Sequence, residues 1–110
     1  MPDIQIFDSA GFFHQKIAEV EQNLIGKKAE MEILLANRRN LESAIETLAV
    51  LPPDHQRAIL QELVSLKEVL STTMRAIAAL EGEIELLTGK LGALQAARML
   101  LELKHESQNS

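Results

Sequence analysis

Near the middle of the chain stands Ala49-Val50-Leu51-Pro52-Pro53-Asp54, a stretch with two consecutive prolines. Each proline lacks a backbone N–H, and each disfavours the α conformation in the residue before it. A helix therefore cannot continue through this stretch. Because long runs with a helical spacing of apolar residues lie on both sides, the sequence predicts an all-α fold. We expect an antiparallel two-helix coiled-coil hairpin that folds back at this turn.

Apolar residues recur at alternating steps of four and three on each side of the predicted turn. The first helix is expected over about 12–51, the turn over 51–54 and the second helix over about 54–105. The first series is Phe13, Ile17, Val20, Leu24, Lys27, Met31, Leu34, Arg38, Leu41, Ile45 and Leu48. The second is Ile59, Leu63, Leu66, Leu70, Thr73, Ile77, Leu80, Ile84, Leu87, Leu91, Leu94, Arg98 and Leu101. This seven-residue repeat is typical of a left-handed coiled-coil seam.

The two ends of the chain lack this repeat. In residues 1–11, Ile4 and Ile6 alternate with Asp3 and Gln5, which predicts an extended N-terminal arm. Residues 106–110 are all polar or acidic, so we expect a disordered tail there.

Polar residues occupy four seam positions: Lys27, Arg38, Thr73 and Arg98. One interpretation is that their stems pack in the seam, their polar ends reach water, and they fix the register of the two helices. The alternative is a buried ion-pair layer that selects a partner. In the predicted hairpin Lys27 lies opposite residues 77–81, so Glu81 is a candidate for its partner.

The second helix carries another apolar stripe beside the seam. It reads Ala76, Ala79, Glu83, Leu86, Lys90, Ala93, Ala97 and Leu100, again in steps of three and four. An apolar arc wider than one seam is typical of a four-helix bundle. We therefore expect hairpins to dimerise into such a bundle, and a mixed bundle with another helical protein is the competing possibility. The expected partner interface comprises Ala76, Ala79, Leu86, Ala93, Ala97, Met99, Leu100 and Leu103.

Composition argues against several classes of function. The formal net charge is −5, whereas nucleic-acid binding usually requires a basic excess, and there is no cysteine for a thiolate zinc site or a thiol nucleophile. His14, His55 and His105 are scattered without metal-ligand spacing. No apolar run approaches the roughly 18 residues of a membrane span, and no basic-then-apolar leader is evident. We expect a cytoplasmic protein that is not an enzyme and binds no cofactor, metal, nucleic acid, membrane or small-molecule substrate.

The order of a long helix, Leu51-Pro52-Pro53-Asp54 and a second long helix is loosely similar to a coiled-coil hairpin of the bacterial flagellar-assembly-protein-A-like family. In that family the hairpin projects from a β-rich domain, which this sequence does not contain. The resemblance covers one turn and the heptads, and it implies a hairpin without assigning a function. Secretion and flagellar export chaperones are also small acidic helical hairpins.

Two functional hypotheses follow. The first is a scaffold or assembly factor that dimerises through its second helix. The second is a small acidic chaperone or adaptor that holds an amphipathic helix of a client, such as a secretion or flagellar component, in an apolar groove. They differ in whether a second copy covers the apolar stripe or a client does.

Overall fold

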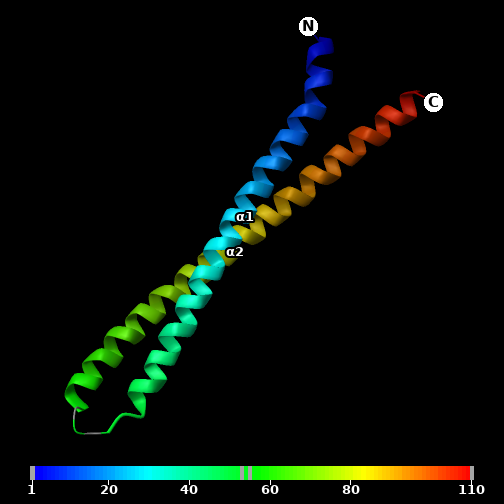
Figure 1. Ribbon diagram of the computed structural model, residues 1–110. Helices are drawn as coiled ribbons and strands as arrows, with labels where there is room; N and C mark the ends of the chain where they lie inside the picture. The colour runs from blue at the N-terminus through cyan, green and yellow to red at the C-terminus, as the bar shows by residue number, and fades with distance from the viewer. Residues whose placement is uncertain (1, 53, 55, 110) are drawn as a thin grey trace. The chain divides into compact units, whose positions relative to one another are not determined.

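The computed structural model describes the backbone of residues 2–52, 54 and 56–109, and the side chains of residues 11–52, 54 and 57–107. It contains helix α1, Pro2–Ala49, and helix α2, Gln56–Asn109 (Figure 1). The described residues include no strand. The predicted all-α helical hairpin is therefore confirmed.

Residues 50–55 separate the two helices, where the sequence predicted a turn over 51–54. Helix α1 stops at Ala49, where the N–H of Leu51 donates a hydrogen bond to the carbonyl oxygen of Leu48 over 3.3 Å. Leu51 and Pro52 each precede a proline, and both lie outside the helices as the sequence requires. Pro53 and His55 lie outside the described residues.

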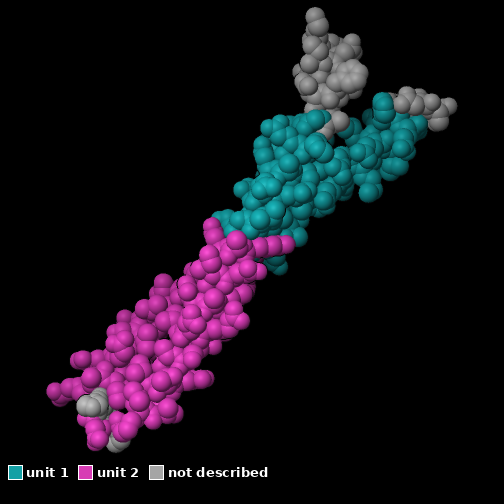
Figure 2. Space-filling model, viewed as in Figure 1, with its two compact units in different colours: residues 1–27, 83–110 teal, residues 28–82 magenta. Residues whose placement is uncertain are grey.

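The chain divides into two compact units (Figure 2). Unit 1 combines Met1–Lys27 with Glu83–Ser110, and unit 2 is Lys28–Gly82. Each unit therefore pairs one segment of α1 with one segment of α2. Unit 2 includes the turn, and unit 1 includes both ends of the chain.

The predicted seam is where the side chains are least exposed. Every position of the two heptad series is buried or half-buried, whereas most positions between them are exposed. The most buried side chains in unit 1 are Ile17, Val20 and Leu24, and those in unit 2 are Ile77 and Leu80. Since these are the inward positions of the repeat, the coiled-coil pattern determines the core of each unit.

The predictions for the two ends are wrong for the residues that can be compared. Residues 2–11 belong to α1 and form no extended arm. The alternation of Ile4 and Ile6 is too short to outweigh the propagation of a long helix, and Pro2 suits a first helical turn. Residues 106–109 continue α2 because no proline or glycine ends it. Met1 and Ser110 lie outside the described residues.

Candidate protein–protein interface

Large apolar side chains of α2 are exposed in unit 1. Leu86 is 76% exposed, Leu100 is 67% exposed, and Met99 and Leu103 are also more than half exposed. Ala93 is exposed as well, and Ala97 is half-buried beside the seam. These residues belong to the partner interface predicted from the sequence, and the single hairpin leaves them exposed or half-buried. Clustered exposed apolar side chains of this kind mark interaction surfaces.

Their position follows from the heptad repeat. When the seam residues occupy the first and fourth positions of the heptad, Leu86, Ala93 and Leu100 all occupy the third. This position lies well around the helix from the seam, roughly a third of a turn away. The seam side chains that pack α2 against α1 are thus different from Leu86, Ala93 and Leu100, which are exposed on this outer face.

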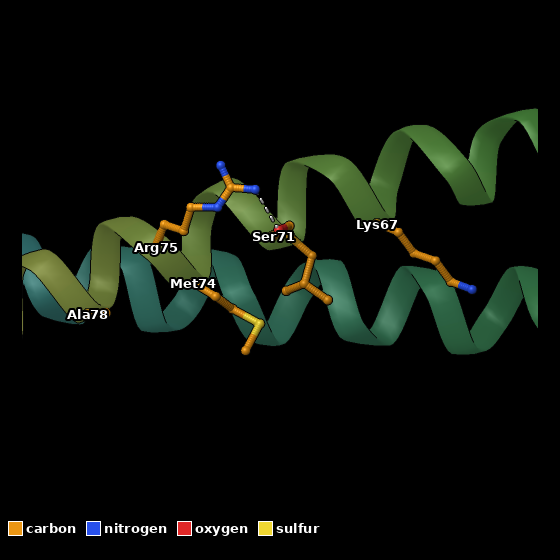
Figure 3. Close-up of a pocket in the computed structure, with 6 residues that line it drawn as sticks. Lys67, Ser71, Met74, Arg75 and Ala78 are labelled. Atoms are coloured by element: carbon orange, nitrogen blue, oxygen red, sulfur yellow. Dashed lines mark hydrogen bonds between the residues drawn. The ribbon is translucent and has the colours of Figure 1, made fainter.

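In unit 2 the remaining predicted interface residues, Ala76 and Ala79, are also exposed. On the other flank of the seam α2 has a shallow groove lined by Lys67, Leu70, Ser71, Met74, Arg75 and Ala78 (Figure 3). Arg75 Nη2 donates a hydrogen bond to Ser71 Oγ over 3.4 Å at its rim. The interface predicted from the sequence did not include this groove. The spacing of Met74 and Ala78, which are apolar and four residues apart on one helix face, could have indicated it.

Lys27 makes an ion pair between the two helices in unit 1. Its Nζ lies 2.9 Å from Glu83 Oε2, two residues along α2 from Glu81, and the pairing with Glu81 stays a prediction. The Glu83 side chain is 53% exposed and that of Lys27 is 35% exposed. A lysine at a seam position can extend its ammonium group to a carboxylate at the solvent edge, and Glu83 supplies one here.

The other polar seam residues bond within their own helices. Arg38 Nε lies 2.8 Å from Glu42 Oε1, and Arg98 Nε lies 3.9 Å from Glu102 Oε1. Thr73 Oγ1 donates a hydrogen bond to the carbonyl oxygen of Val69 over 2.8 Å. In the single hairpin no polar or charged side chain among those described is buried.

A cleft opens between α1 and α2 in unit 1. Its lining residues are Gly11, His14, Gln15, Arg98, Leu101 and Glu102. Close by in the sequence, the rings of Phe12 and Phe13 meet edge to face with centroids 5.7 Å apart. Lys16 Nζ lies 5.7 Å from the centroid of Phe12, which is 53% exposed. This aromatic pair adds apolar surface near the end of the hairpin.

Potential metal-ligating side chains do not cluster in the described part of the chain. No cluster of three or more His, Asp or Glu side chains that could hold a metal ion occurs among the described residues. His14 lines the unit 1 cleft, His105 is exposed on α2, and His55 falls outside the description. Of the two helices as described, neither has the length and apolar character needed to cross a membrane.

The exposed features of this hairpin are apolar side chains spaced at helical intervals and flanked by charges. Such an arrangement can bury itself against another helix, because leucine and alanine at these steps interlock with a matching face. No family model, curated protein or solved structure matches the chain.

Proposed function

We propose that this protein is a non-enzymatic helical interaction module, a scaffold or assembly factor, that acts as a homodimer of hairpins. The observation that carries the proposal is the exposed apolar face of α2, where Leu86 and Leu100 are 76% and 67% exposed. Burying a leucine fully is worth about 1.5–3 kcal/mol, so two such residues per chain give a second helix layer a substantial driving force.

The seam itself also supports a second layer. Only a few seam residues, such as Val20 and Ile77, fall below one-tenth exposure, and the rest are half-buried. Domains are generally stable when their apolar faces are covered by another layer of secondary structure. A four-helix bundle made from two hairpins would provide that layer for each of them.

A second copy of the chain is the occupant that we propose for this face. Closed two-fold pairing is the commonest form of assembly, and it requires only one kind of self-complementary surface. Another helical protein is the competing partner, and the assembled bundle would present its remaining exposed side chains to a larger complex.

A chaperone or adaptor is the second candidate function. The unit 2 groove favours it, because Leu70, Met74 and Ala78 provide an apolar floor and Met74 is 45% exposed. Flexible methionine side chains are frequent where a surface accepts varied helical clients. In this case the protein would remain a monomer until a client helix occupied the groove.

Sedimentation equilibrium of the purified chain at micromolar concentrations tests the proposal. The wild-type protein is expected to sediment as a dimer, and the double variant L86E/L100E as a monomer with unchanged helix content. The matched control is I33E, since Ile33 of α1 is 63% exposed but lies outside the proposed interface. A wild-type monomer over the whole concentration range would contradict the homodimer and favour the chaperone.

A further inference from the structure

We infer that two copies of α2 pair antiparallel through the outer face of unit 1, with Ala93 at the two-fold axis. The inference rests on the proposed homodimer and specifies its contact and register. We define the outer face by its residues at the third and seventh heptad positions, which are Glu83, Leu86, Lys90, Ala93, Ala97, Leu100 and Lys104. They lie on the yellow to red part of α2 in Figure 1.

The order of side chains along this face is self-complementary when it is reversed. In a two-fold contact, if residue i of one copy meets residue j of the other, then j also meets i. We place residues opposite one another when their numbers add up to 186 or 187. Leu86 then meets Leu100 of the second copy, and Ala93 meets Ala93 of the second copy. The most exposed leucines of unit 1 thus cover one another on both sides of a small central residue.

The charges fit the same register. At each end of the contact, Glu83 of one copy faces Lys104 of the other. The dimer therefore contains two such pairs of opposite charge. Lys90 faces Ala97, whose small side chain leaves room for the lysine stem. Glu83 also pairs with Lys27 of its own chain through Oε2, but its side chain remains 53% exposed, so it can accept a second cation.

A parallel pairing of the same faces would place each residue against its own equivalent. Glu83 would then face Glu83, Lys90 would face Lys90, and Lys104 would face Lys104. Like charges opposite one another along a helix seam disfavour that arrangement. The charge pattern therefore selects the antiparallel register, in which none of these like-charge contacts occurs.

The contact is short, since residues 83–104 span about 32 Å at 1.5 Å per residue. Three heptads are near the lower limit for a stable coiled coil. We therefore expect a dissociation constant in the micromolar range, and a dimer that forms and separates with changes in protein concentration.

Single-cysteine cross-linking tests the register, and the wild-type chain contains no cysteine that would interfere. The variant A93C is expected to form a disulfide-linked dimer under mild oxidation, because its two cysteines meet at the axis. The matched control is A79C, which replaces another exposed alanine of α2. In the proposed register its two copies are 28 residues apart along the helix, or about 42 Å, and should not cross-link.

A second pair of variants tests the leucine contact. L86C alone and L100C alone should remain unlinked, because equivalent positions lie about 21 Å apart in this register. An equimolar mixture of the two variants should give the mixed disulfide. A parallel pairing would instead link each variant to itself.

Charge reversal gives an independent measurement. K104E should raise the dissociation constant about tenfold, because both Glu83–Lys104 pairs become repulsive. K90E changes the net charge equally but faces Ala97, so its effect should be less than threefold. Equal effects of the two variants would contradict the register.

The possible outcomes separate this inference from the proposed function. A dimer in which A79C cross-links as well as A93C, or in which A93C does not cross-link, overturns the register and leaves the homodimer standing. A protein that sediments as a monomer overturns both.

Discussion

At the scale of single residues, Lys27 shows how little a charge in the seam need contribute to stability. Its ion pair with Glu83 spans 2.9 Å, but both side chains are at least one-third exposed. Pairs as exposed as this are worth about 0–1 kcal/mol, because water and salt screen them. The larger effect at this position is the burial of the lysine stem against the opposing helix.

The first prediction concerns this lysine. K27L should raise the free energy of unfolding by about 1 kcal/mol, because a leucine at a seam position buries more apolar surface than the ion pair offsets. Urea denaturation at fixed protein concentration measures the change. K28L is the control, since Lys28 is exposed beside the seam and should give no gain. A loss of stability in K27L would show that the Lys27–Glu83 pair is worth more than exposure allows.

Gly26 allows a second prediction at this scale. It lies inside α1, and a Cβ added there would meet no atom within 4 Å. G26A should therefore stabilise the hairpin by about 0.5–1 kcal/mol, since alanine loses less conformational freedom in a helix. The midpoint of thermal unfolding reports the change. A destabilised G26A protein would mean that another molecule approaches this position in solution.

At the scale of the helices, the heptad repeat predicted which residues face inward. Side chains as different as Phe13, Lys27 and Thr73 all lie in the seam because spacing, and not residue type, determines the face of a helix. The helix ends were harder to predict. Ile4 and Ile6 suggested an extended segment, but a long helix propagates at little cost until a breaker such as Pro52 stops it.

The ion pair of Lys27 illustrates a second limit. A pattern of spacing identifies the facing region of the other helix to within about one turn, which includes both Glu81 and Glu83. That Lys27 reaches Glu83 depends on the path of a flexible side chain, and the one-dimensional repeat does not contain that information. The outer face of α2 was recognisable from its steps of three and four, whereas its exposure could only be read from the structure.

The difference between seam and outer positions gives a prediction for α2. I77A should destabilise the protein by about 2–4 kcal/mol, because Ile77 is only 4% exposed and its loss leaves a cavity. I33A makes the same chemical change on α1, where Ile33 is 63% exposed, and should cost less than about 1 kcal/mol. Similar losses for the two variants would indicate that Ile33 is covered in solution and that the seam is not the dominant core.

At the scale of the whole molecule, stability should depend on protein concentration. If hairpins associate, mass action favours the folded dimer, so the unfolding midpoint should rise as the concentration is raised. We expect this for the wild-type protein in thermal unfolding measured by circular dichroism between low and high micromolar concentrations.

L86E/L100E should show a constant midpoint, because both leucines are exposed in the single hairpin and their replacement removes only the contact between copies. I33E should keep the wild-type dependence. A wild-type midpoint that does not move with concentration would mean that each hairpin folds alone, and the apolar face of α2 would then need a different partner.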